Sequence, residues 1–162
     1  MDEKATLKYL ERMRINYELV THPAIFNMAE AEAVKLPHPE AEAKNLFICD
    51  DKGNHYYLLT VQGTKRVDLK KFRRQFDTRR LHFASADDLK RYLGITPGEV
   101  TPLGLLNDDA CKVSWYLDHY FTTQPLIGVH PNTNTSTIWL NPTDLVFLIH
   151  HHGNDIHITG FE

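Results

Sequence analysis

Long apolar runs are missing from this sequence of 162 residues. No window approaches the roughly 18 consecutive apolar residues that a membrane-spanning helix requires, which argues against a membrane protein or a membrane partner. The first residues, Met1–Lys4, show no basic region followed by an apolar stretch. We therefore expect no secretory signal and a cytoplasmic protein.

Cysteine is scarce, and its two positions are far apart. Cys49 and Cys111 do not form a Cys-x-x-Cys motif, which argues for reduced thiols in a cytosolic setting. We interpret both as reduced thiols that behave as small buried hydrophobic residues. The sequence thus indicates neither a disulfide scaffold nor a cysteine metal site.

Net charge is also small, at −3, which excludes a globally basic nucleic-acid-binding protein. The charge is uneven, however: residues 65–80 carry eight basic and two acidic side chains, net +6, which leaves −9 on the remainder. Asp68 is a plausible N-cap for a helix that turns Leu69, Phe72 and Phe76 inward and its basic residues outward. A solvated helix face is one interpretation. The other is a patch that binds a phosphate backbone, since clustered like charges repel unless an anion neutralises them.

Histidine is abundant, with ten residues, three of them adjacent at 150–152. A histidine-based metal hydrolase is therefore one alternative. Consecutive helical residues point in different directions, so these three cannot bind one ion from a helix. We interpret them as the last turn of a helix that stops before Gly153, where cations suit the helix dipole.

Both helical and strand-like periodicity occur along the chain. Helices are predicted over 2–14, 28–35, 69–76, 85–94 and 141–152, and strands over 17–21, 43–49, 55–61, 81–84, 112–117, 126–140 (two strands) and 156–161. Residues 96–109, rich in proline, glycine and asparagine, are expected to form an ordered loop. The sequence predicts a single α+β domain over 1–162, with a mixed, largely antiparallel sheet flanked by helices.

The segment 126–140 concentrates polar groups between two apolar strands. It holds Gly128, a histidine before a proline at 130–131, and six consecutive hydroxyl or amide side chains from Asn132 to Thr137. Such residues are common in simple hairpin turns, but they also suit a site that binds a small polar ligand. Lys44 and Asn45 open another apolar strand. A lysine there is either a solvated strand end or a group that holds a phosphate or a polarised carbonyl.

Four motifs occur in an order and spacing that resemble a known family. They are Lys44-Asn45-Leu46-Phe47, Leu103-Gly104-Leu105 with Asn107-Asp108, His130-Pro131-Asn132 with Asn134-Thr135, and Thr143-Asp144-Leu145. Together they resemble the YbaK/ProX family of aminoacyl-tRNA deacylases, in particular its freestanding prolyl-tRNA editing branch (PrdX, or ProXp-ala). The likeness runs from about Tyr17 to about Phe147 and implies the editing-domain fold of that family.

The resemblance implies hydrolysis of alanine wrongly attached to proline tRNA, in trans and without a metal or other cofactor. The implied partners are aminoacylated proline tRNA and prolyl-tRNA synthetase. Some relatives select cysteine, so editing of cysteine on proline tRNA is one alternative. A tRNA-binding or synthetase-binding module without catalysis is another.

The resemblance also assigns roles to individual residues. It implies catalytic roles for Lys44, Asn45, Gly128 and His130 and substrate binding by Val129, Pro131, Asn132 and Asn134. The excess positive charge of residues 65–80, and not the resemblance, predicts tRNA binding by Lys65, Arg66, Lys70, Lys71, Arg73 and Arg74. Backbone amides of 128–130 would stabilise the oxyanion, Lys44 would hold the tRNA end or the substrate carbonyl, and His130 would orient the amino acid or water. The loop departs from the Gly-x-x-x-Pro spacing of related domains by one residue.

Overall fold

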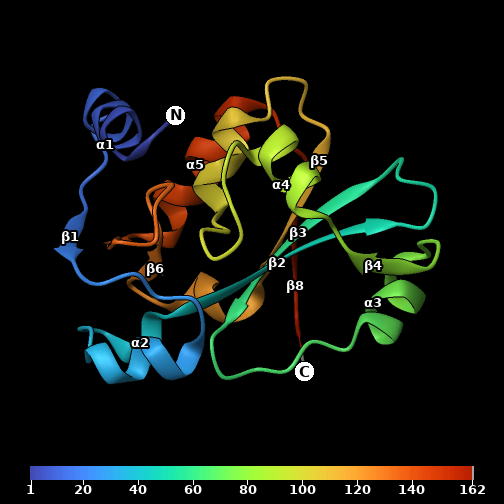
Figure 1. The fold of residues 1–162 in the computed structure, drawn as a ribbon, viewed down its shortest axis with the longest axis horizontal. Helices are drawn as coiled ribbons and strands as arrows, with labels where there is room; N and C mark the ends of the chain where they lie inside the picture. The colour runs from blue at the N-terminus through green and yellow to red at the C-terminus, as the bar shows by residue number, and fades with distance from the viewer. Residues whose placement is uncertain (162) are drawn as a thin grey trace.

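Two β-sheets form the centre of the protein in the computed structural model, which describes residues 1–161 apart from the side chains of Met28 and Ala31 (Figure 1). The strands are β1 (Glu18–Thr21), β2 (Ala43–Asp50), β3 (Tyr56–Gln62), β4 (Leu81–Phe83), β5 (Val113–Asp118), β6 (Ile127–Val129), β7 (Ser136–Leu140) and β8 (Ile156–Thr159). One sheet has the order β4-β2-β3-β5-β8 and the other β1-β7-β6. Glu162 lies outside the described residues.

The helices occupy the segments between and beside these strands. They are α1 (Glu3–Arg12), α2 (Met28–Val34), α3 (Leu69–Phe76), α4 (Ala86–Leu93) and α5 (Pro142–His152), with short 3-10 helices η1 (Pro39–Ala41), η2 (Pro102–Asn107) and η3 (His119–Thr123). Asp68, Ser85 and Asn141 cap α3, α4 and α5 with their side chains. The three adjacent histidines end α5, as the sequence predicted.

The predicted α+β class and its mixed, largely antiparallel pairing are confirmed. Strand β2 pairs antiparallel with β3 and β4, while β5 pairs parallel with β3 and β8. Strand β7 pairs antiparallel with β1 and β6. The division into two sheets was not predicted, because local periodicity identifies strands without identifying their partners.

The five-stranded sheet is covered on both faces. Alternate residues of β5 point to opposite sides, so Trp115 joins the larger apolar cluster beneath α4, η2 and α5, and Tyr116 joins the smaller one beneath α3. Figure 1 shows α4 and α5 together on one side of the sheet and α3 on the other. Phe72 of α3 is buried against Tyr116, with ring centroids 4.9 Å apart.

Residues 96–109 contain more regular structure than the expected loop. Thr101 caps η2 by accepting a hydrogen bond from Leu103 N, and η2 buries Leu103, Leu105 and Leu106 in the larger cluster. The leucines of this segment therefore form part of the core.

The two sheets meet where β2 begins. An isolated parallel bridge joins Glu42, just before β2, to Gly128 in β6. This junction brings the Lys44-Asn45 motif beside the Gly128 segment, although the two are far apart in sequence.

Asp118, at the end of β5, binds groups from three neighbouring segments of the chain. Its buried carboxylate accepts hydrogen bonds from the backbone N–H groups of Gln62 and Tyr120, and it forms an ion pair of 3.0 Å with Lys65 Nζ. One carboxylate thus ties the ends of β3 and β5 to the start of the basic segment.

Replacing Asp118 with Ala removes an acceptor from three donors at once. We expect the free energy of unfolding to fall by about 3 kcal/mol, because buried donors are left without partners. The control is Asp51→Ala, which breaks the exposed pair with Arg79 and is expected to lower the free energy of unfolding much less, because solvent screens that pair. Urea unfolding measures both, and equal losses would contradict the structural role of Asp118.

Candidate functional site

A cavity of about 420 Å³ lies at the junction of the sheets. Its lining comes from the loop before α2, the start of β2, the loop before η2, and strands β6 and β7. The lining residues are Ile25, Phe26, Asn27, Leu36, Glu42, Ala43, Lys44, Asn45, Gly98, Val100, Gly128, Val129, His130, Thr137 and Trp139. The structure therefore gathers all four predicted catalytic residues and Val129 around one space.

Lys44 places an ammonium group at the edge of this cavity. Its Nζ donates a hydrogen bond to the backbone carbonyl of Lys65. Burial lowers the pKa of Lys44, and the nearby positive charge of Arg66 lowers it further. The Lys44 ammonium group can attract an anionic or polarised oxygen. It lies next to Lys65, where the basic segment, residues 65–80, begins.

Asn45 is oriented by a short chain of hydrogen bonds through the sheet. The indole N–H of Trp115 donates to Thr60 Oγ1 at 2.8 Å, and the Thr60 hydroxyl donates to Asn45 Oδ1 at 2.6 Å. The Thr60 hydroxyl thus accepts a hydrogen bond from the indole with one lone pair and uses its proton to donate to Asn45. The Asn45 amide nitrogen has no hydrogen-bond partner among the described residues, so this donor is available to a ligand in the cavity.

His130 presents an unprotonated ring nitrogen when it is neutral. Its Nδ1 lies 3.2 Å from the Ser136 carbonyl, which can only accept, so the proton sits on Nδ1 and the Nε2 lone pair remains. Burial lowers the pKa of His130, which outweighs the opposite effect of the Ser136 contact. The imidazole is therefore neutral at pH 7 and can accept a proton or a hydrogen bond.

Gly128 is required by close packing. Its φ is not positive, but a Cβ at this position would lie 2.8 Å from Trp139 Nε1 and 3.2 Å from Cδ1. Gly128 and Trp139 are directly paired across β6 and β7. The missing side chain lets the indole lie against the backbone and form one wall of the cavity.

Three residues that were expected to bind substrate do not line the cavity. Pro131 is buried, and the Asn132 amide donates to Thr6 Oγ1 of α1 at 2.9 Å. The backbone carbonyl of Asn134 accepts from Ile25 N, and its side chain lies near Gly98 at the rim. Burial of Pro131 and the bond of the Asn132 amide to Thr6 make both residues part of the packing, although the buried Asn132 Oδ1 has no hydrogen-bond partner among the described residues.

Several lining residues were missed by sequence reasoning. Trp139 was interpreted only as part of a strand, and Thr137 only as the last residue of the polar run 132–137. The Thr137 hydroxyl contacts His22 Nε2 at 2.8 Å beside His130. Phe26, which is 62% exposed, packs over Gly98 at the cavity. Glu42 is an acidic lining group whose pKa is raised by burial and by the nearby charge of Glu32. Isolated residues of these types carry no recognisable motif.

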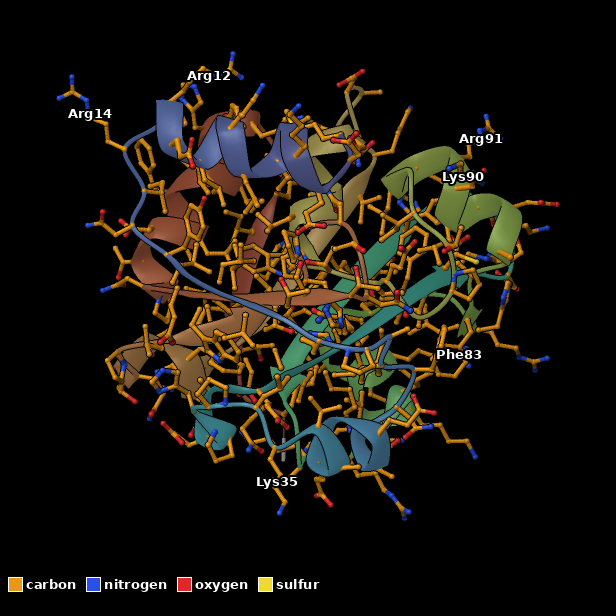
Figure 2. All side chains as sticks on the ribbon, turned by 60° about the vertical axis from the view of Figure 1, so that its left-hand side comes forward. Arg12, Arg14, Lys35, Phe83, Lys90 and Arg91 are labelled. Carbon is orange, nitrogen blue, oxygen red and sulfur yellow. The ribbon has the colours of Figure 1, made fainter. Side chains whose placement is uncertain are left out.

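In the basic segment, residues 65–80, some cations form ion pairs with carboxylates of the protein and others are exposed to solvent. Lys65 is paired with Asp118, whereas Arg66 and four basic residues of α3 are exposed: Lys70, Lys71, Arg73 and Arg74. Helix α3 lies away from α2, and the connection over 63–68 runs between the cavity end of β3 and α3 (Figure 1). Other basic side chains, such as Lys90 and Arg91 of α4, extend outward from a separate part of the surface (Figure 2).

Residues 1–161 contain neither a cluster of metal ligands nor a helix that could span a membrane. No group of three or more His, Cys, Asp or Glu side chains in this range is arranged to hold a metal ion. None of its helices has the length and apolar character needed to cross a membrane.

Comparison with known proteins gives the class of this site. A family model described as the aminoacyl-tRNA editing domain matches residues 22–148. The chain is 34% identical over 155 residues to the prolyl-tRNA editing protein ProX of Acetoanaerobium sticklandii, covering 95% of this chain and 94% of that protein. It is 31% identical over 161 residues to prolyl-tRNA synthetase associated domain-containing protein 1 of Mus musculus, covering 94% and 92%.

A solved structure shows the same fold. It is described as a candidate trans-editing enzyme for prolyl tRNA synthetase and matches with a TM-score of 0.72 at 21% identity, covering 100% of this chain and 98% of that one. Fold, cavity and family model together define an editing domain. The chain belongs to the aminoacyl-tRNA editing domain family, the YbaK/ProX family that its motifs resemble, and it is an aminoacyl-tRNA deacylase.

The hydrogen-bond chain to Asn45 gives a prediction for Thr60. Thr60→Val keeps the shape of the side chain but leaves the Trp115 N–H unpaired and the Asn45 amide free to rotate. We expect the free energy of unfolding to fall by about 1–3 kcal/mol and kcat/KM for aminoacyl-tRNA to fall about tenfold. Thr60→Ser, which retains the hydroxyl, is the matched control. Equal deacylation rates for the two variants would show that the chain does not position Asn45.

Proposed function

We propose that residues 1–162 form one editing domain that hydrolyses alanine wrongly attached to proline tRNA, acting in trans. The tRNA assignment is supported by the relatives, which are named as a prolyl-tRNA editing protein and a prolyl-tRNA synthetase associated protein. The choice of alanine is supported by the resemblance to the ProXp-ala branch. Prolyl-tRNA synthetase is the implied source of the mischarged product.

The chemical need for such a domain follows from the synthetase's own limits. A pocket built for proline cannot strongly reject the smaller alanine, because a missing methylene is worth only about 1–3 kcal/mol. A second site that acts on the alanyl ester and spares the prolyl ester corrects the error. The small apolar walls of the cavity, including Ile25, Val100 and Val129, are compatible with a small side chain.

The observation that carries the proposal is the convergence of Lys44, Asn45 and His130 on one cavity. In the proposed reaction, water attacks the ester carbon and the carbonyl oxygen becomes negative. When this intermediate collapses, the bond to the ribose oxygen breaks, and the ribose hydroxyl leaves with the proton that the water has lost. Lys44 Nζ and the Asn45 amide are donors for that oxygen or for the tRNA end, and His130 Nε2 accepts a hydrogen bond from the amino acid or the water. The adjacent ribose hydroxyl of the substrate assists in positioning the water.

The oxyanion donors are then mainly side chains. Gly128 has a strand partner on each side, Trp139 in β7 and Glu42 through the isolated bridge. Its backbone is therefore part of the junction between the sheets as well as a wall of the cavity. One donor to an oxyanion is typically worth about 3 kcal/mol of the activation barrier, so the loss of either polar side chain has a measurable effect.

Lys44→Ala tests catalysis against simple tRNA binding. We expect deacylation of alanyl proline tRNA to fall at least a hundredfold, because a charged donor leaves the cavity, while tRNA affinity changes only a few-fold. Single-turnover release of alanine and a filter-binding assay measure the two quantities. Lys52→Ala, which removes an exposed lysine at the other end of the same β-hairpin, is the control.

If Lys44→Ala deacylates as fast as the unaltered protein, the catalytic assignment is wrong. If the unaltered protein binds the tRNA but releases no alanine, the protein is a binding module that does not hydrolyse the ester. The two outcomes differ, because only the second removes the proposed activity itself.

The exposed cations of α3 give a prediction for tRNA approach. With the aminoacyl end in the cavity, the acceptor stem would follow the 63–68 connection towards α3 (Figure 1). Arg73→Ala with Arg74→Ala should weaken tRNA binding and reduce the slope of log affinity against log salt by about two, roughly one for each lost phosphate contact.

The matched control for this pair is Lys90→Ala with Arg91→Ala, which removes two adjacent exposed cations from α4 (Figure 2). It should leave the salt slope nearly unchanged. If the α4 pair changes the slope and the α3 pair does not, the tRNA approaches over a different face.

A further inference from the structure

Trp139 holds a polar atom that the fold itself does not use. Its side chain is 1% exposed, and among the described residues its indole Nε1 has no hydrogen-bond partner. A buried donor without a partner costs stability, so such atoms are rare in folded proteins and call for an explanation. Trp139 also lines the cavity, beside Gly128.

The surroundings hold the indole in this orientation. On one side, Gly128 leaves just enough room for Nε1, because even a methyl group there would lie 2.8 Å from it. On another side, His38 makes an edge-on contact with the indole, with ring centroids 5.7 Å apart. The N–H is thus fixed in direction rather than left in a loose pocket.

The other tryptophan shows what a structural indole looks like in this protein. Trp115 is equally buried, but its N–H donates to Thr60 at 2.8 Å. The Trp115 indole of β5 therefore has an acceptor within the fold, whereas the Trp139 indole of β7, at the cavity wall, has none among the described residues. This contrast points to a ligand as the missing acceptor for Trp139.

We propose that the Trp139 indole N–H donates a hydrogen bond to an oxygen of the aminoacyl-ribose end of the substrate. An indole nitrogen only donates, so its partner is an acceptor such as the acyl oxygen or the ribose 2′-oxygen and not the substrate ammonium group. Trp139 then acts with Lys44 and Asn45 as a third side-chain donor around the reacting ester. This inference rests on the proposed function, because it names a further residue of the same site.

Nuclear magnetic resonance tests the contact without requiring turnover. The protein has two tryptophans and hence two indole N–H signals; the signal lost in Trp139→Phe identifies Trp139. The probe is 3′-(L-alanyl)amino-3′-deoxyadenosine, whose amide replaces the ester. We expect a downfield shift of the Trp139 proton on binding and little change at Trp115. Binding of the probe with no shift of the Trp139 proton would overturn the proposal.

The same probe without the 2′-hydroxyl separates the two candidate oxygens. A shift that persists assigns the bond to the acyl oxygen, and a shift that disappears while the probe still binds assigns it to the 2′-oxygen. Either result supports a hydrogen bond to the aminoacyl-ribose end.

A kinetic test removes the N–H alone. Site-specific replacement of Trp139 by benzothienylalanine puts sulfur in place of N–H with almost the same shape. We expect kcat/KM on alanyl proline tRNA to fall roughly ten- to hundredfold, as for a lost hydrogen bond to a developing negative charge, with the thermal midpoint unchanged or raised. Unchanged kinetics would contradict the role of the N–H.

The two tests also separate this inference from the proposed function. If the unaltered protein releases no alanine, the proposed function fails, and the shift of the Trp139 signal then decides the contact by itself. If the protein is active but both Trp139 tests are negative, only the inference fails.

Discussion

The close approach of the Trp139 indole to the backbone of Gly128 is the constraint on which the site depends. A glycine is needed there because any side chain would collide with the ring, and the ring forms a cavity wall because the glycine lets it approach. The same glycine bridges to Glu42, two residues before Lys44. The contact that joins the two sheets therefore also places the Lys44-Asn45 motif across the cavity from His130.

Hydrogen bonds within the sheets then set the chemical state of each polar group. The Ser136 carbonyl holds the proton of His130 on Nδ1, and Thr60 directs the Asn45 oxygen away so that the amide nitrogen is free. Burial lowers the pKa of both His130 and Lys44, which favours a neutral imidazole and weakens the hold of the lysine on its proton. Lys44 and Asn45 thereby supply two donors to the cavity, and His130 supplies an acceptor, in defined orientations.

Features that depend on neighbours in sequence were predictable. The caps at Asp68, Ser85 and Asn141, the amphipathic α3 and the end of α5 at the histidines follow from local side-chain chemistry. The catalytic residues were also found, but through a resemblance between motifs and not through geometry. Their convergence on one cavity requires the pairing of β6 and β7 and the bridge to Glu42, which no local pattern encodes.

Features that depend on distant partners could not be predicted. Lys65 looked like one more cation of the basic segment, but it is paired with Asp118, 53 residues away. Asn132 lies two residues from His130, yet its amide is bonded to Thr6 at the other end of the chain. The sequence placed Trp139 in an apolar strand, but a strand pattern does not reveal an indole N–H that lacks a partner among the described residues.

The most direct measurement is the release of amino acid from proline tRNA charged separately with alanine, cysteine and proline. The account predicts rapid hydrolysis of the alanyl ester, with the cysteinyl and prolyl esters largely spared. Preferential hydrolysis of the cysteinyl ester would keep the fold and the chemistry of the cavity but contradict the assignment to alanine. Hydrolysis of none of the three esters by a protein that still binds the tRNA would contradict the proposed editing reaction itself.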